Sequence, residues 1–279
     1  MLAEKTITKR MPISFSRQPI RFESDIPFFS NANEYIKNYE IIAHDHVSEM
    51  TKTGKNPFID ESLWKESENA TAGLIAKYSK ANDFILDIGV GLGRILTKFP
   101  HLKRYGMDIS IDYLKHAQKK GIQVCFSLIE DMPYQLNSFD IIVCTDVLEH
   151  VFDLNDCCKK ILSVLKPSGI LIIRTPFAED LTAYAKADYP YKYAHLRTFD
   201  QNSLFLLFTK IFNCQVMETQ LSGYRHYPRR FKYSSCSQFN LLTSFLMRCL
   251  RQFTPALYKL LVTKLYNPIE INMVIKKSN

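Results

Sequence analysis

The sequence of 279 residues lacks any Cys-x-x-Cys pair, although it contains seven cysteines. Several of these cysteines lie in apolar runs such as Ile-Ile-Val-Cys at residues 141–144, a pattern typical of buried thiols in a reducing compartment. The odd number and the spacing argue against a disulfide framework and against a zinc site. We therefore expect no bound metal ion.

Long apolar stretches are also absent. No segment approaches the roughly 18 unbroken apolar residues of a membrane-spanning helix, and the N-terminal residues contain no apolar core of a signal peptide. The sequence therefore predicts a cytoplasmic protein. Peripheral membrane contact stays open, because residues 239–266 carry Leu, Phe and Met at helical spacing with Arg and Lys between them.

Acidic residues are in the minority, and the formal net charge is +8. Such a charge favours encounter with phosphate-bearing substrates, acidic membranes or nucleic acid, without deciding among them. Part of the excess lies in Arg225, Arg229, Arg230 and Lys232. This cluster predicts either a local basic patch, which would suit RNA or a nucleotide-linked sugar, or a solvated rim.

The order of predicted elements indicates one large α/β domain. Residues 1–33 show no period and are expected to form an irregular leader, and helices are expected over residues 34–50 and 61–80. Thereafter, short β-rich runs alternate with helical segments, which predicts βαβ units and a parallel sheet. We expect residues 1–80 to pack on a core domain of residues 81–279.

The boundaries of the predicted elements follow from these patterns. Strands are expected over residues 84–88, 104–108, 123–127, 139–145, 170–175, 214–220 and 270–276. Helices between them are expected over residues 91–99, 111–120, 154–165 and 203–212. Residues 221–268 are too long for a hairpin loop and form an insertion. Its helical part is predicted to be an amphipathic cap over the substrate pocket, with a membrane-surface helix as the alternative.

A glycine-rich turn follows the first of these strands. In Asp-Ile-Gly-Val-Gly-Leu-Gly, residues 87–93, glycines at alternate positions let the backbone turn sharply and approach a ligand closely. A dinucleotide fingerprint would need glycine at position 94, where the sequence has Arg94, and there is no phosphate-loop Lys-Ser/Thr. A nicotinamide dehydrogenase and a nucleoside triphosphatase are therefore disfavoured.

Acidic residues follow the next strands. Asp108 ends the second strand, where a carboxylate can accept hydrogen bonds from both hydroxyls of a ribose. Ile-Glu-Asp-Met-Pro, residues 129–133, follows the third strand, and Thr-Asp-Val-Leu-Glu-His-Val, residues 145–151, follows the fourth. Because the carboxyl ends of parallel strands face one crevice, these loops are predicted to converge on a single site.

These motifs resemble those of the class I S-adenosylmethionine-dependent methyltransferases of the ubiquinone-biosynthesis type. The resemblance runs from about residue 83 to residue 176 and includes Leu-Lys-Pro-Ser-Gly at residues 165–169, where Lys-Pro-Gly-Gly is commoner. It implies a Rossmann-like, doubly wound sheet of seven mostly parallel strands, of which the last is antiparallel. It also implies S-adenosyl-L-methionine as the cofactor and S-adenosyl-L-homocysteine as the product.

The resemblance also implies cofactor-binding roles, position by position. Asp87 and the backbone of the three glycines would hold the amino acid moiety, and Asp108 the ribose. Asp131 would bind the adenine amine, with Met132 beside the ring, and residues 146–148 would form the wall near the methionine end. The implied cofactor-binding residues are Asp87, Gly89, Gly91, Gly93, Asp108, Ile109, Glu130, Asp131, Met132, Asp146, Val147 and Leu148.

The acceptor site has a weaker signature. Methyl transfer is an in-line displacement, which needs a general base only when the acceptor starts protonated. His195 and His150 are candidate bases, although each could instead serve local structure. Tyr35 and Tyr39 could close over the cofactor beside the substrate, or could be core residues. Arg197 could orient an acidic acceptor or form a structural pair.

The class of acceptor is predicted from what the fourth strand lacks. The strand leads into Cys-Thr-Asp-Val. By resemblance, enzymes that methylate exocyclic amines would have Asn/Asp-Pro-Pro-Tyr/Phe at this place. The Pro-Cys nucleophile that cytosine C5 methyltransferases require does not follow either. We therefore expect methylation, most simply at oxygen, of a small-molecule acceptor such as a metabolite, glycan or lipid intermediate, and nucleic acid is disfavoured as a partner. The alternatives are an RNA or nucleotide methyltransferase and a non-catalytic binding module.

Overall fold

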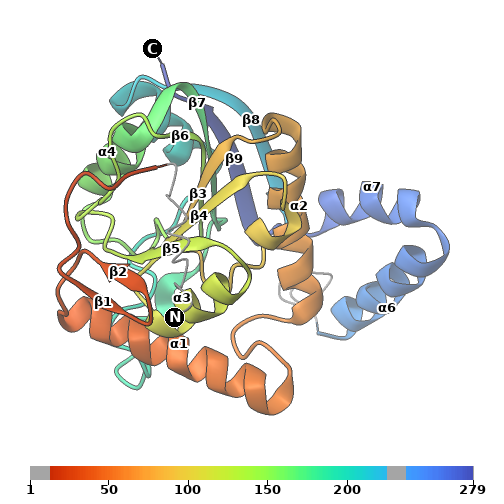
Figure 1. The fold of residues 1–279 in the computed structure, drawn as a ribbon. Coiled ribbons are helices and arrows are strands. Elements are labelled where there is room, and N and C mark those ends of the chain that lie inside the picture. The colour runs from red at the N-terminus through yellow and green to blue at the C-terminus, as the bar shows by residue number, and fades with distance from the viewer. Residues whose placement is uncertain (1–12, 225–236, 279) are drawn as a thin grey trace, which may run out of the picture.

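The computed structural model describes residues 13–224 and 237–278. Figure 1 shows a central twisted sheet with helices on both of its faces. The predicted basic patch at residues 225–232 lies outside the described residues. None of the described helices is long and apolar enough to cross a membrane.

Nine strands form one sheet in the order β1-β2-β5-β4-β3-β6-β7-β9-β8. The strands are β1 (Arg21–Glu23), β2 (Ile26–Phe28), β3 (Phe84–Ile88), β4 (Lys103–Asp108), β5 (Gln123–Phe126), β6 (Phe139–Thr145), β7 (Leu165–Pro176), β8 (Gln215–Ser222) and β9 (Glu270–Lys276). Neighbouring strands from β5 to β7 pair in parallel, whereas β9 is antiparallel to both β7 and β8. The predicted seven-stranded core with an antiparallel last strand is therefore confirmed.

Helices cover both faces of the sheet, as a doubly wound fold requires. The α-helices of the described residues are α1 (Glu34–Thr53), α2 (Glu61–Tyr78), α3 (Ile111–Lys119), α4 (Leu154–Val164), α5 (Gln201–Leu206), α6 (Ser237–Phe253) and α7 (Pro255–Leu265), of which α6 and α7 lie outside these layers (Figure 1). Ile161 of α4 and Leu204 of α5 belong to one buried apolar cluster. Ile75 of α2 and Leu114 of α3 belong to a second, and each cluster also takes side chains from the sheet.

The leader departs from the sequence prediction. Residues 21–28, expected to be irregular, form the hairpin of β1 and β2, and β2 extends the sheet by pairing in parallel with β5 at Phe28 and Phe126. The two phenyl rings stack with their centroids 4.3 Å apart. At the turn, Ser24 and Asp25 take positive φ angles, as the tight turns of two-residue hairpins require. Such a short hairpin has no clear periodicity, so its signal lies in the tertiary pairing.

The helix predicted over residues 91–99 was also wrong. The structure has only a short 3₁₀ turn, η1 (Leu96–Lys98), in this segment. Gly91 and Gly93 have φ angles of 49° and 70°, so the chain does not enter a right-handed helix at these positions. The helix predicted over residues 203–212 is divided into α5 and a π-helical turn, η3 (Leu207–Ile211).

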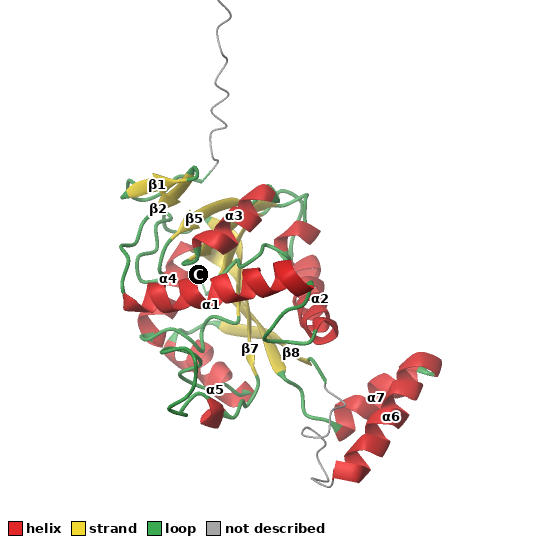
Figure 2. Ribbon diagram, turned by 90° about the horizontal axis from the view of Figure 1, so that it is seen from below, coloured by secondary structure: helices red, strands yellow, loops and turns green. Residues whose placement is uncertain are grey.

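The insertion between β8 and β9 contains the two helices α6 and α7, which pack on each other as an antiparallel hairpin. Met247, Val262 and Tyr266 form a small buried core within this hairpin. Figure 1 and Figure 2 both show α6 and α7 standing out to one side of the domain, next to α2. The predicted helices of the insertion are confirmed, whereas its predicted role as a cap over the substrate pocket stays a prediction.

Candidate active site

The glycine turn joins β3 to η1 at the carboxyl edge of the sheet. Gly89, Gly91 and Gly93 all have positive φ angles, which only glycine adopts without strain. A Cβ atom on Gly89 would lie 2.3 Å from Cγ2 of Val147, so this glycine also permits close packing with the loop after β6. A Cβ atom on Gly91 would meet nothing closer than 4.0 Å. The turn therefore leaves open space beside Gly91.

The carboxylate of Asp108 faces this turn from the end of β4. One oxygen accepts a hydrogen bond from the backbone N–H of Gly91 at 2.9 Å. The other accepts from the N–H groups of Ile109 and Ser110 at 2.8 and 3.0 Å. Burial raises the pKa of Asp108 to about 6, against the lowering effect of these hydrogen bonds. Asp108, the residue predicted to bind the ribose, is thus held in place next to the glycine turn.

Asp87, the last acidic residue before the turn, is buried with only 2% of its surface exposed. Its Oδ1 atom has no hydrogen-bond partner among the described residues. Burial raises the pKa of Asp87 well above its usual value, and the charge of Arg174 opposes this rise. An unpartnered carboxylate oxygen beside an open glycine turn fits a ligand with an ammonium group, such as the amino acid end of S-adenosylmethionine.

The leader packs on the loop after β5, where Asp131 lies. Ser30 donates a hydrogen bond from its hydroxyl to Oδ2 of Asp131 at 2.7 Å, and the same hydroxyl accepts from the N–H of Leu128. Arg17 donates to the backbone carbonyl of Asp131 at 2.6 Å. Met132 is half-buried against the core. These contacts hold the predicted adenine-binding loop through a segment of the chain about a hundred residues away.

Asp146 begins the loop after β6 and forms an ion pair with Arg174 of β7. A second hydrogen bond joins Nε of Arg174 to Oδ1 of Asp146 at 3.1 Å. Arg174 is only 3% exposed, and it also donates to the hydroxyl of Thr71 on α2. Sequence reasoning missed Arg174, although an arginine within the apolar run of β7 was a visible signal, since buried charges are rarely found without a partner.

A histidine pair lies beyond Asp146, at the same edge of the sheet. His195 forms a hydrogen bond through Nδ1 with Oε2 of Glu179. Tyr184 donates to the other oxygen of Glu179 at 2.8 Å. Burial would raise the pKa of Glu179, but the hydrogen bond and charge of His195 outweigh it and lower that pKa. With Nδ1 held by a carboxylate, His195 has Nε2 left to act on a substrate.

His150 is the second member of the pair, and its ring centroid lies 4.6 Å from that of His195. Its Nδ1 atom lies 2.7 Å from the hydroxyl of Tyr39 and 3.2 Å from the carbonyl oxygen of Ala194. Because a carbonyl only accepts, these contacts favour a proton on Nδ1 and a lone pair on Nε2. Burial, together with the charge of His195, lowers the pKa of His150 to about 4.

The two predicted substrate tyrosines lie beside this pair. The ring centroids of Tyr35 and Tyr39 on α1 lie 4.7 Å apart, and the ring of Tyr35 also packs against that of Phe152. Arg197, by contrast, donates to backbone carbonyls of the loop after β6, including Leu148 at 2.9 Å and Phe152 at 3.1 Å. The guanidinium of Arg197 is thus bound to backbone carbonyls. These contacts favour a structural role for Arg197 over a role in orienting the acceptor.

Glu149 is a further residue that sequence reasoning missed. It is 1% exposed, and neither carboxylate oxygen has a hydrogen-bond partner among the described residues. Its Oε1 lies 3.9 Å from Nε2 of His150, and burial raises its pKa well above the usual value. Glu149, His150 and His195 each offer one atom that could bind a metal ion, and these three atoms lie within 4.8 Å of one another. This donor set could hold a divalent cation, a class of ligand not expected from the sequence.

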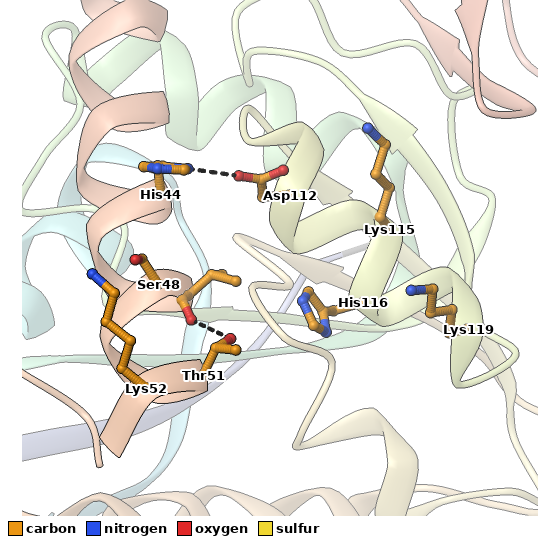
Figure 3. Close-up of a pocket in the computed structure, with 9 residues that line it drawn as sticks. His44, Ser48, Thr51, Lys52, Asp112, Lys115, His116 and Lys119 are labelled. Atoms are coloured by element: carbon orange, nitrogen blue, oxygen red, sulfur yellow. Dashed lines mark hydrogen bonds and ion pairs between the residues drawn. The ribbon is translucent and has the colours of Figure 1, made fainter. Parts of the chain in front are cut away.

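A separate pocket lies between α1 and α3. It has a volume of about 360 Å³ and is lined by basic side chains of both helices, including Lys52, Lys115 and Lys119 (Figure 3). His44 and Asp112 face each other across this pocket, with 3.6 Å between Nδ1 of His44 and Oδ2 of Asp112. None of the predicted cofactor or acceptor residues lines this pocket, so it is distinct from the carboxyl-edge site.

Comparison with known proteins agrees with this geometry. Residues 79–222, more than half of the chain, match the family described as methyltransferase domain. The chain belongs to this family. The match covers the glycine turn, the loops after β4, β5 and β6, and both histidines, and it confirms the resemblance to class I S-adenosylmethionine-dependent methyltransferases.

Individual relatives match less of the chain. The ubiquinone biosynthesis O-methyltransferase of Xanthomonas axonopodis is 27% identical over 185 residues, which are 60% of this chain and 77% of that protein. The protein MJ0638 of Methanocaldococcus jannaschii is 32% identical over 42% of this chain and 49% of its own. This chain spans about half the length of several such curated relatives.

Solved structures share the fold. A structure of the Haloferax volcanii Trm112 methyltransferase activator with a methyltransferase matches 88% of this chain and 98% of the matched chain, with a TM-score of 0.58 and 13% identity. YcgJ of Bacillus subtilis matches 76% of this chain and 99% of its own, with a TM-score of 0.50 and 20% identity. These similarities confirm the Rossmann-like methyltransferase architecture.

Proposed function

We propose that the protein is an S-adenosylmethionine-dependent methyltransferase that methylates an oxygen atom of a small-molecule acceptor. The observation that carries this proposal is the proximity of the two regions at one sheet edge. Gly89 is in direct packing range of Val147, and the histidine pair begins three residues later at His150. An acceptor held by the histidines would therefore lie next to a cofactor held by the glycine turn.

The residues around the turn suit the cofactor that we propose. Asp87 would accept from its ammonium group and Asp108 from its ribose hydroxyls, while the open space at Gly91 admits the main chain of its amino acid moiety. When bound, this cofactor supplies an electrophilic methyl group on a sulfonium. Val147 and Leu148 would bound the site on the side of the acceptor.

The histidine pair would activate the acceptor. A hydroxyl becomes a good nucleophile when its proton is removed during attack, and His195 can accept that proton at Nε2. Glu179 would stabilise the imidazolium that forms, since its carboxylate already holds Nδ1. Methyl transfer to this oxygen would give a methyl ether and S-adenosylhomocysteine, in which the sulfur would retain the electron pair of the broken bond, and the acceptor proton would stay on His195.

A second mode of activation is favoured by one observation, the unpartnered buried carboxylate of Glu149. A divalent cation held by Glu149, His150 and His195 would satisfy that carboxylate and lower the pKa of a coordinated hydroxyl. The sequence predicts no metal ion, so the two modes of activation predict opposite effects of a chelator on activity. Activity that survives dialysis against a chelator supports the base mechanism, and activity restored only by added Mg²⁺, Mn²⁺ or Zn²⁺ supports the cation.

The relatives suggest a class of acceptor. Proteins named as ubiquinone biosynthesis O-methyltransferases are among the matches, so a hydroxyl on an aromatic small molecule is the acceptor to test first. Tyr35, Tyr39 and Phe152 lie beside His150 and would offer such a ring an aromatic wall.

Calorimetry with S-adenosylmethionine and S-adenosylhomocysteine tests the cofactor. We expect micromolar binding that Asp108→Ala weakens. Asp112→Ala, which removes a neighbouring carboxylate in the pocket between α1 and α3, should leave the binding unchanged. Absence of binding would contradict the proposal. A scaffold that merely retains the fold would bind the cofactor without turnover.

Transfer of an isotopically labelled methyl group to small-molecule extracts tests the acceptor. We expect label in a phenolic or other hydroxyl-bearing product. Label recovered instead in RNA, with binding that falls steeply as salt rises, would replace the small-molecule assignment with the nucleic acid alternative.

A further inference from the structure

The hairpin of α6 and α7 exposes an apolar surface outside the active site. On α6, Leu241, Leu242, Phe245, Leu246 and Phe253 are all exposed, between 56% and 74% of their surface. Their spacing of three, four and seven residues places them along one side of the helix. The opposite side, with Met247, packs on α7. Figure 2 shows that the hairpin projects to one side of the sheet.

α7 also exposes apolar side chains. Leu257 and Leu260 are exposed by 44% and 54%, although Val262 on the same helix is buried in the hairpin core. A soluble monomer rarely exposes a large contiguous set of leucine and phenylalanine side chains, because their transfer from water is favourable. The surface therefore calls for an apolar partner.

The charge of the sequence segment that contains the hairpin indicates which partner the surface fits. Residues 219–269 contain eight Lys or Arg and no Asp or Glu, whereas the rest of the chain has 28 basic and 28 acidic residues. The whole formal excess of +8 thus lies in this segment. Arg248, Arg251 and Lys264 of the hairpin are exposed to solvent.

We propose that the α6–α7 hairpin docks the protein on an anionic lipid surface. The exposed leucine and phenylalanine side chains would enter the boundary between headgroups and acyl chains, while the basic side chains contact lipid phosphates. A nucleic acid would pair with the basic groups but leave the apolar side in water. A second copy of the chain would cover the apolar side but bring two positive hairpins together without any acidic residue of the hairpin between them.

Sedimentation of the full chain with lipid vesicles tests this proposal. We expect binding to phosphatidylcholine vesicles that contain about 30% phosphatidylglycerol, and much weaker binding to phosphatidylcholine alone. The variant Phe245→Ser/Leu246→Ser should weaken the binding by roughly tenfold or more, since it removes two inserted side chains. Arg248→Glu/Lys264→Glu should weaken binding chiefly at low salt.

The chain offers a matched control for the apolar variant. Phe205 and Leu206 form the same dipeptide at exposed positions of α5, with exposed fractions of 45% and 52%. Phe205→Ser/Leu206→Ser should bind vesicles as the unaltered protein does. All variants are compared by circular dichroism and thermal midpoint, because exposed substitutions should leave the fold intact.

Three outcomes would overturn the proposal. The first is no binding to anionic vesicles, and the second is an equal loss of vesicle binding in the α5 variant. The third is a dimer in solution that Phe245→Ser/Leu246→Ser converts to monomer, which would assign the surface to a second copy of the chain. Cofactor binding is measured in parallel. Vesicle binding without cofactor binding would count against the proposed function alone, because lipid docking does not depend on methyl transfer.

Discussion

The glycine turn and the histidine cluster lie side by side at the carboxyl edge of the sheet, but they are built differently. The turn is one continuous segment, residues 87–93, whose conformation depends on its own glycines. The histidine cluster brings together α1, the loop after β6 and two positions of the long segment after β7. A local turn can keep one ligand pocket constant, whereas an assembled cluster can change its acceptor through any of several loops.

The first prediction tests whether the cluster serves catalysis alone. His195→Ala should lower kcat by about 10² to 10⁴ fold if the histidine is the base, with cofactor affinity unchanged. Glu179→Gln should give a smaller loss, because it keeps a hydrogen-bonding group beside Nδ1. The measurement is steady-state kinetics with the identified acceptor, together with calorimetry. A parallel loss of cofactor affinity would show that the two regions are not separable.

Arg174 joins the two regions, since it pairs with Asp146 and its charge acts on Asp87. Arg174→Met should reduce the free energy of unfolding by about 1–3 kcal/mol, because the buried carboxylate of Asp87 loses a nearby positive charge and the hydroxyl of Thr71 loses a hydrogen-bond donor. Arg248→Met, at an exposed position, should change it by less than about 0.5 kcal/mol. Urea denaturation measures both. Similar values for the two variants would contradict a structural role for the buried arginine.

The glycine turn can be probed with two matched substitutions. Gly89→Ala and Gly91→Ala both place alanine at a positive φ angle, but only the first brings Cβ against Val147. Gly89→Ala should therefore be less stable than Gly91→Ala by about 1–3 kcal/mol in urea denaturation. Gly91→Ala should mainly weaken cofactor binding, because its methyl group enters the open side of the turn. Equal stabilities would mean that the β6 loop adapts to the added atom.

The smallest expected effect is the pH dependence of cofactor binding. Asp108 has a pKa of about 6 in the free protein, and its charged form is the better acceptor for ribose hydroxyls. Affinity should therefore rise with pH through about 6, with a loss of roughly tenfold from pH 7 to pH 5. Asp108→Asn should remove this dependence. Calorimetry across this range measures it, and a pH-independent affinity in the unaltered protein would be inconsistent with the assignment.

The amino-acid sequence by itself determined the proposed cofactor half of the site. Asp87, the three glycines and Asp108 are recognisable because strand periodicity and the conformational freedom of glycine act over a few residues. The sequence also indicated an amphipathic insertion, and it named His150 and His195 as separate candidates.

Only the tertiary structure decided which distant residues meet. The partnership of His195 with Glu179, the contact of His150 with Tyr39 and the burial of Arg174 against Asp146 have no local signature. Each depends on how loops are placed by the packing of the sheet and its helices. The same holds for α6 and α7, whose sequence indicates an apolar side, whereas the folded chain determines that this side faces solvent.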